Sequence, residues 1–432
     1  MGMVHTARRK AGPARLAVLG GVVLICLSVS AVGCGTVSPG GHERSGIPPT
    51  GTQEAKVPAR GALADPAATA AALARGRWSV LAASPLGSRQ APVVAWTGAE
   101  LLEIGGMAGG IARSDGAAFD PAQRRWHRIA PVPGPVGTAA AASVWTGSQL
   151  FVFGVQAPPG KTAAGPAAGL YDPGSGRWAV SATAPFGRQA LQQPAVVWTG
   201  RLVIVAGLDH TRVEAASYDP TAGTWQRQDP PLPQAHPALG IAMVATADRV
   251  ILWSLWGRFQ QTAPFAGYSG VDVRALAGGR WHDVTGDWPQ HHTVPPPLFT
   301  GTQILIPPGQ IWCGACSHPA PVGEHAWLAD PGTLRLTPLS PGPLDDLGPL
   351  LVWTGRAVIS INPGGQITGP HVSVQPGDMA AWDPASGHWR RLPRAPRLLQ
   401  YDATPAWTGQ ELLAIAADGA LLGFGKRASP GG

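Results

Sequence analysis

Two cysteines separated by a glycine and an alanine carry the most reactive side chains in the second half of the chain. Cys313 and Cys316 lie in the string IWCGACSH. A thiol pair at this spacing suits three kinds of chemistry: redox exchange, a local structural disulfide, or zinc binding together with two imidazoles. The nearest following imidazoles belong to His318 and His325, whose seven-residue spacing is not that of a zinc finger.

The residues around the two cysteines favour the structural role. The string from Trp312 to Cys316 resembles the active-site string of thioredoxin, in which the first thiolate lies at a helix N-terminus that lowers its pKa. Prolines flank this string on both sides, no helix is indicated, and the family's proline between the cysteines is absent. We therefore expect Cys313 and Cys316 to form a local disulfide, which an export signal at the N-terminus also favours.

The N-terminus has the three parts of such a signal. A basic region ends at Arg15, residues 16–32 form an apolar run, and small residues precede Cys34. The string AVGC resembles the lipobox of bacterial lipoproteins, whose cysteine is diacylated and becomes the new N-terminus. We therefore predict a lipoprotein signal peptide at 1–33, lipid attachment at Cys34 and a place at the extracytoplasmic face of the cell membrane. An uncleaved anchor helix and plain secretion remain alternatives, because the apolar run is near the lower length limit of a membrane span.

Composition and charge exclude several classes of protein. With 17 Trp, 44% hydrophobic and only 13% charged residues, the chain folds rather than staying disordered. Its 58 Gly and 45 Pro, without long amphipathic stretches, favour many short strands over a helical bundle. The net charge of the whole chain is +7. Residues 1–33 contain four Lys and Arg and no Asp or Glu, so residues 34–432 carry a net charge of +3. Because the remaining basic residues are scattered, we expect no nucleic-acid partner.

Three segments lie outside the strand-rich part. Residues 34–61 are rich in Gly, Pro, Ser and Thr and predict a flexible tether. Residues 62–76 predict a short helix with Asp65 as N-cap and Pro66 at the first helical position. Residues 426–432 predict a disordered tail.

A repeat of about 50 residues fills the rest of the chain. Its first mark is a Thr-Gly step between two apolar stretches, first at Thr97, last at Thr408, with a degraded copy at Thr246. This step predicts a tight hairpin turn between two buried strands. The second mark is an aromatic-Asp-Pro string with a Trp seven positions on, as from Phe119 to Trp126, which predicts a hairpin between a third and a fourth strand.

The two ends of the repeat region complement each other. The last unit has no fourth strand, whereas Trp78 lies in a fourth-strand pattern that no first three strands precede. We therefore predict an all-β ring of seven four-stranded antiparallel blades at 77–425, in which the N-terminal fourth strand joins the three C-terminal strands. Closing so long a loop costs on the order of 5 kcal/mol in chain entropy, so the ring depends on this junction.

The repeats resemble the kelch type of β-propeller, of the galactose-oxidase-like central domain superfamily, in which an apolar strand ends in paired glycines, as at Gly105 and Gly106. In this family the ligand face is usually built by the loops between strands two and three and by the connections between blades. The resemblance implies these candidate ligand-binding residues: Arg89, Arg188, His210, His236, His291, His292, His371 and Asp402. Arg89, Arg188 and His236 hold similar places before a first strand, which would point them at one central opening.

Catalysis finds less support in the sequence. Galactose oxidase, a kelch-fold enzyme, holds copper with two Tyr and two His, but Tyr171 and Tyr218 hold repeat positions here, and neither Tyr268 nor Tyr401 has an adjacent His. We therefore expect no metal, no other cofactor, and a binding or scaffolding module for an extracytoplasmic protein or glycan. The alternative is an enzyme acting on extracellular carbohydrate through the central pocket. A carbohydrate platform would use Trp residues outside the repeat positions, such as Trp256, Trp288, Trp312 and Trp327.

Overall fold

The computed structural model covers most of the repeat region. It describes residues 50–51, 69–134, 136–138, 141–154, 166–187, 191–257, 270–286, 288, 296–307, 326–340, 342–343, 350–362, 377–400 and 403–425. The predicted signal peptide at 1–33, the tail at 426–432 and most of the tether lie outside these residues. Among the described residues, no helix is long and apolar enough to cross a membrane.

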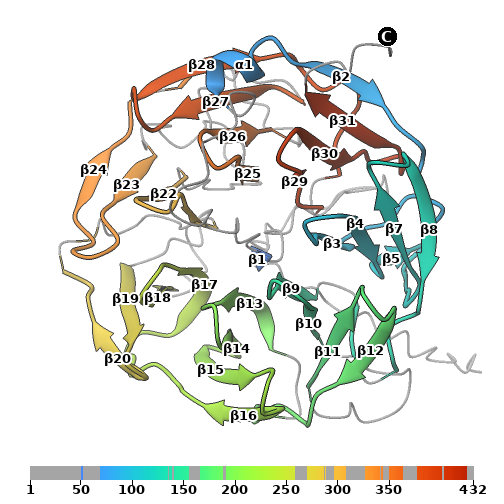
Figure 1. Cartoon of the computed structure of the whole chain (residues 1–432). Coiled ribbons are helices and arrows are strands. Elements are labelled where there is room, and N and C mark those ends of the chain that lie inside the picture. Colours follow the sequence, from blue (N-terminus) through green and yellow to red (C-terminus); the bar gives the residue numbers. More distant parts are fainter. Residues whose placement is uncertain are drawn as a thin grey trace, which may run out of the picture.

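Seven four-stranded antiparallel sheets form a closed ring (Figure 1). Each sheet is called a blade here. Blade 1 contains β3 (Val93–Trp96), β4 (Leu101–Ile104), β7 (Gly116–Asp120) and β8 (Arg125–Ile129), and the hairpin of β5 (Met107–Ala108) and β6 (Ile111–Ala112) lies between its second and third strands. Blade 2 contains β9 (Ala142–Trp145), β10 (Leu150–Gly154), β11 (Ala167–Asp172) and β12 (Arg177–Val180). Blade 3 contains β13 (Gln192–Trp198), β14 (Val203–Asp209), β15 (Arg212–Asp219) and β16 (Thr224–Arg227).

The other complete blades follow in chain order, which confirms the predicted fold class. Blade 4 contains β17 (Ala238–Ala245), β18 (Val250–Trp256), β19 (Gly270–Ala277) and β20 (Arg280–Asp283). Blade 5 contains β21 (Leu298–Phe299), β22 (Ile304–Ile306), β23 (Trp327–Ala329) and β24 (Leu336–Pro338). Blade 6 contains β25 (Leu350–Trp353), β26 (Val358–Ile361), β27 (Met379–Asp383) and β28 (His388–Leu392).

Blade 7 joins the two ends of the chain. Its strands are β29 (Ala406–Trp407), β30 (Glu411–Ile415), β31 (Leu421–Gly425) and β2 (Arg77–Val80), which precedes blade 1 in sequence. Trp78 lies opposite Phe424 in the register of β2 and β31, and the two ring centroids are 5.1 Å apart. The predicted composite blade is therefore confirmed.

Short polar side chains close the hairpins. Thr97 Oγ1 accepts the N–H of Glu100 at 2.9 Å and donates to its carbonyl at 3.1 Å. The same contacts recur at Thr146, Thr199, Thr300, Thr354 and Thr408. Gly98 in this turn has a φ of +95°, a conformation that favours glycine. Between third and fourth strands, Asp120 Oδ1 accepts the N–H groups of Ala122 and Gln123, so the Asp-Pro strings act as turns.

Hydrophobic clusters fill the interfaces between neighbouring blades. The second and third strands are almost entirely buried, and each of seven clusters among the described residues combines side chains of two adjacent blades. Blade 1, for example, packs Leu101 and Phe119 against Leu413 and Leu421 of blade 7. Because the second strands are buried on both faces, they are apolar runs such as LFVFG, whereas the fourth strands, such as RWHRI, are largely exposed and polar.

Indole hydrogen bonds also join each blade to the one before it. The Trp of the fourth strand, called the outer tryptophan here, donates through Nε1 to a backbone carbonyl that follows the fourth strand of the preceding blade. Within the described residues the bonds run from Trp78 to Pro393, Trp126 to Ala82, Trp178 to Ala130, Trp225 to Ala182, Trp281 to Gln228 and Trp389 to Ser340, at 2.7–3.1 Å. The outer tryptophans therefore orient neighbouring blades as well as filling the core.

Arginine side chains make parallel contacts between the blades. Arg128, Arg227 and Arg391 each lie two residues after an outer tryptophan and donate to the carbonyls of Pro85, Pro185 and Pro343. In blade 4 this position holds Asp283, and the arginine comes from the third strand instead. Arg274 Nε donates to Pro231 O at 3.0 Å, and its Nη1 lies 2.9 Å from Asp283 Oδ1.

Blade 5 departs from this pattern. Leu336 stands in place of the outer tryptophan, opposite Ala329, and leucine has no donor for a carbonyl of blade 4. Trp288, from the connection before blade 5, packs into this interface, with its ring centroid 5.5 Å from that of Trp253. The contact between blades 4 and 5 therefore has no outer indole hydrogen bond among the described residues. Arg249 Nη1 of blade 4, which donates to Gly332 O of blade 5 at 3.1 Å, is a polar contact between these two blades.

Two short elements near the N-terminus differ from the sequence prediction. Helix α1 (Ala70–Leu73) has Thr69 as N-cap, with Oγ1 accepting the N–H of Ala72 at 3.1 Å. The N-cap of this helix is thus Thr69 and not the predicted Asp65, which lies outside the described residues. Strand β1 (Thr50–Gly51) pairs in parallel with β13 inside the ring (Figure 1), so two residues of the predicted tether form a strand.

Replacing an outer tryptophan tests the indole hydrogen bond. In Trp178→Phe the ring stays but the donor to Ala130 is lost, so we expect the free energy of unfolding to fall by about 1 kcal/mol beyond the cost of the smaller ring. Trp382→Phe is the matched control, because Trp382 is buried, its Nε1 has no partner among the described residues, and blade 1 carries Phe119 at the same position. Urea unfolding of both variants measures the difference. Equal losses in the two variants would contradict the role given to the indole.

Candidate functional site

One face of the ring carries the loops in which ligand-binding residues were predicted. Since the strands of a blade alternate in direction, the loop between the second and third strands leaves the sheet at the same end as the connection to the next blade. This side is called the connection face here. Of the predicted residues, Arg89, His210 and His236 are described. The rest lie outside the described residues: Arg188, His291, His292, His371, Asp402, Cys34, Cys313 and Cys316.

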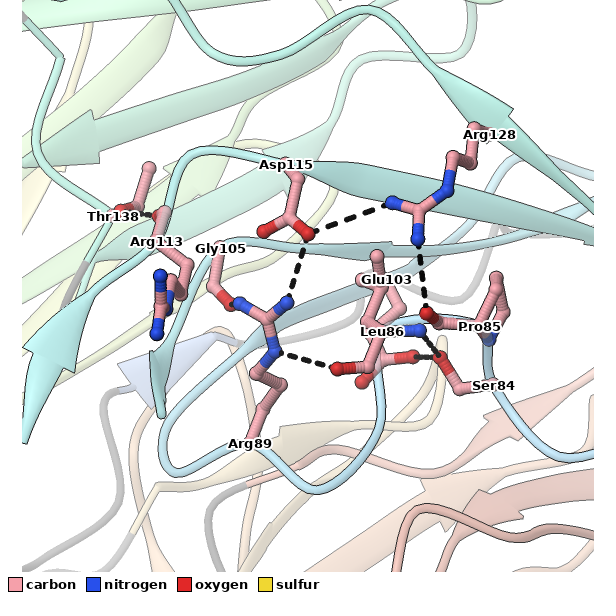
Figure 2. A network of polar contacts seen from close by, with 10 residues as sticks. All are labelled: Ser84, Pro85, Leu86, Arg89, Glu103, Gly105, Arg113, Asp115, Arg128 and Thr138. Atoms are coloured by element: carbon pink, nitrogen blue, oxygen red, sulfur yellow. Dashed lines mark hydrogen bonds and ion pairs between the residues drawn. The ribbon is translucent and has the colours of Figure 1, made fainter. Parts of the chain in front are cut away.

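Arg89 is held inside the protein rather than offered to a ligand (Figure 2). Its Nε donates to Leu86 O at 3.1 Å, its Nη1 to Gly105 O at 3.3 Å and its Nη2 to Asp115 Oδ2 at 2.9 Å. Only 5% of the side chain is exposed. Partial burial alone raises the pKa of Asp115, but the hydrogen bond and charge of Arg89 outweigh it and lower that pKa. Arg89 and Asp115 therefore form an ion pair that fixes the connection between blades 7 and 1.

Beside this pair lies a carboxyl group that the sequence analysis did not single out. Glu103, on β4, is fully buried, and Ser84 Oγ donates to its Oε2. Burial raises the pKa of Glu103 to about 7, although the hydrogen bond from Ser84 and the charge of Arg89 oppose that effect. Six residues after the turn threonine, the other blades have these residues in its place: Val152, Val205, Leu252, Ile306, Ser360 and Ala414. Glu103 is the charged residue in the otherwise apolar string LLEIGG, and this contrast is the sequence signal that could have identified it.

Acidic residues recur at one position on the connection face. Asp115, Glu214, Asp272 and Asp378 each lie five residues before the last residue of a third strand. Each has a basic partner: Arg89 for Asp115, Arg227 for Glu214, His236 for Asp272 and Arg394 for Asp378. In blade 4 the basic partner of the acidic residue is thus an imidazole, whereas in the other three blades it is a guanidinium.

His236 is the predicted residue that is both held in place and open to solvent. Its Nδ1 lies 2.8 Å from Asp272 Oδ2, and its ring stacks on Trp256 with centroids 3.8 Å apart and planes 9° from parallel. The side chain of Asp272 is 9% exposed and that of His236 is 29% exposed. A carboxylate bound to Nδ1 orients the imidazole, so that Nε2 can accept or donate a hydrogen bond.

Among the described residues around His236, none is placed as the second group that a catalytic pair needs. Ser254 lies opposite Asp272 in the register of β18 and β19, but its Oγ has no hydrogen-bond partner among the described residues. Ser254 therefore does not contact His236 as a nucleophile contacts its base. Among the described residues, no group of three metal-binding side chains is present.

The other two described candidates, His210 and Arg89, belong to different parts of the ring. His210 lies at the tip of the two-residue turn between β14 and β15, with a φ of +55° and a side chain that is 73% exposed. The next residue, Thr211, accepts the N–H of Ala238 at 2.8 Å, so His210 and His236 lie on neighbouring segments. Arg89 belongs to the connection between blades 7 and 1, three blades away in the ring.

The tryptophans considered for a carbohydrate platform are largely taken up by packing. Trp288 is buried, and Trp327 packs against the same cluster between blades 4 and 5. His236 covers one face of Trp256, and Trp312 lies outside the described residues. The structure therefore offers no open aromatic platform among the described members of this group.

Part of the chain is similar in sequence to a kelch-like protein. The chain is 28% identical to Kelch-like protein 35 of Mus musculus over 166 residues, which are 38% of this chain and 27% of that protein. With the seven-bladed ring, this match supports a kelch-type propeller. A solved structure, "Structure of YjhT", shares 13% identity and a TM-score of 0.42, over 80% of this chain and 96% of that one. No protein-family model matches the chain.

Changing Arg89 tests whether it is a structural residue. Arg89→Lys keeps the charge but cannot make the three contacts of the guanidinium, so we expect the free energy of unfolding to fall by about 2 kcal/mol. Arg113→Lys, at an exposed arginine of the same region, should change it by less than ~0.5 kcal/mol. Thermal and urea unfolding measure both variants. An Arg89→Lys protein as stable as the parent would refute the role given to Arg89.

Proposed function

We propose that this protein is a membrane-tethered, extracytoplasmic binding or scaffolding propeller for a protein or glycan ligand. The kelch-type fold supports a binding or scaffolding role. His236 carries the proposal, because a buried carboxylate orients it and part of its ring is open to solvent on the connection face. The tether rests on the signal-like N-terminus that ends at Cys34.

A single substitution tests the lipid anchor. We expect the full chain, expressed in a bacterium that processes lipoproteins, to enter the membrane fraction and to incorporate labelled palmitate. Cys34→Ser should abolish labelling and release the protein. Cys26→Ser, within the apolar run, is the matched control and should behave like the parent. Membrane association that survives Cys34→Ser would favour an uncleaved anchor helix instead.

A second substitution tests the binding face. The Cys34→Ser protein is immobilised and screened against a glycan array and extracts of the cell envelope, with His236→Ala beside it. If a ligand contacts Nε2, the variant should bind about tenfold less, since one lost hydrogen bond of this kind is worth about 1.4 kcal/mol. His127→Ala is the matched control, because His127 is exposed on the fourth strand of blade 1. Equal binding by His236→Ala and the parent would place the ligand elsewhere.

The alternative is an enzyme that acts on extracellular carbohydrate. One observation favours it: His236 and Asp272 have the geometry in which a carboxylate orients a general base. Glycans that are shortened or released during the same array experiment, and that stay intact with His236→Ala, would support this alternative.

A further inference from the structure

The connection between β2 and β3 is the segment through which the closing strand reaches blade 1. Leu81 N donates to Leu421 O at 2.8 Å, and Ser84 N donates to Gly419 O at 3.0 Å, so this segment follows blade 7. Ser84 Oγ then donates to Glu103 Oε2 in blade 1. Ser84 is thus hydrogen-bonded to both blades at the joint between the two ends of the chain.

Glu103 is poorly compensated as an anion at this joint. Its Oε1 has no hydrogen-bond partner among the described residues. The donors of the nearest cation, Arg89, go to two backbone carbonyls and to Asp115 rather than to Glu103. Leaving a buried charge partly unpaired is costly, whereas a protonated carboxyl in the same place can both donate and accept.

Among the described residues, Arg89 is the one cation whose charge lowers the pKa of Glu103. On the same face of blade 1 lie Val94, its partner in the register of β3 and β4, and Leu101. These pack against apolar side chains of blade 7, including Leu413, Ile415 and Leu421. The charged groups around Glu103 are Arg89, Asp115 and, beyond Asp115, the largely exposed Arg128.

We propose that Glu103 makes the closure of the ring pH-dependent. The protonated carboxyl stabilises the contact between blades 7 and 1, and the ionised carboxylate destabilises it. The effect is specific to this joint, because the other blades carry apolar residues or Ser360 at the position of Glu103. The inference does not rest on the proposed function.

The sign of the effect follows from linkage. The pKa of Glu103 is raised from 4.5 to about 7 in the folded protein, so its contribution to stability is complete below 4.5 and is lost as the pH rises through 7. A difference of that size corresponds to a change of roughly 300-fold in the equilibrium constant for unfolding, spread over this range of pH.

Urea unfolding of the full chain between pH 5 and pH 9 tests the proposal. The parent should lose stability between pH 6 and pH 8 relative to Glu103→Gln, which stays neutral throughout. Glu103→Val, with the residue of blades 2 and 3, should follow the profile of Glu103→Gln, since both variants keep the other titratable groups, including Glu411, whose pKa burial also raises. Ser84→Ala should move the loss to higher pH, because the Ser84 hydroxyl stabilises the ionised carboxylate. Parallel pH profiles of the parent and the two Glu103 variants would overturn the proposal.

Amide hydrogen exchange of the parent gives a readout that needs no variant. After correction for intrinsic rates, protection of β2 and β31 should fall at least about tenfold from pH 6 to pH 8, while that of β11 and β12 in blade 2 stays unchanged. A uniform fall in all blades, or none at β2, would overturn the inference.

Discussion

The pairing of β2 with β31 is the constraint on which the ring depends. Elsewhere the four strands of a blade are consecutive in the chain, but here two strands from opposite ends must find each other. Trp78 contributes to three contacts at once: the register with β31, the ring contact with Phe424 and the indole bond to Pro393 of blade 6. Gly76 is also required, since a Cβ there would lie 2.7 Å from the Phe424 ring.

The architecture could be predicted because its marks are local. The turn threonine and the turn aspartate both form hydrogen bonds with residues two or three positions away. They need no distant partner, so the spacing of the turns is visible in the sequence. The cap of α1 is harder to predict, because Asp and Thr are both good N-cap acceptors and the packing of Ala70 and Leu73 against blades 6 and 7 is not visible in the sequence.

The candidate site was harder to predict, because partners distant in sequence decide what each side chain does. Arg89 and His236 have similar places before a first strand, yet one is a buried ion-pair partner and the other is partly open. Their carboxylates lie 26 and 36 positions away. In the sequence Glu103 is an isolated polar residue. Its pKa is raised mainly by burial and further by the charge of Asp115, and both depend on the folded structure.

Arg274 shows how these repeats have diverged. It reaches the carbonyl of Pro231 from a third strand, whereas Arg128 and Arg227 reach theirs from a fourth, and Asp283 fills the vacated place. These blades thus share the carbonyl acceptor and the cation but differ in the strand that supplies the cation. A chimeric propeller made by exchanging single strands between repeats would therefore have two arginines at one interface between blades and none at another. Whole blades are thus the smallest interchangeable units.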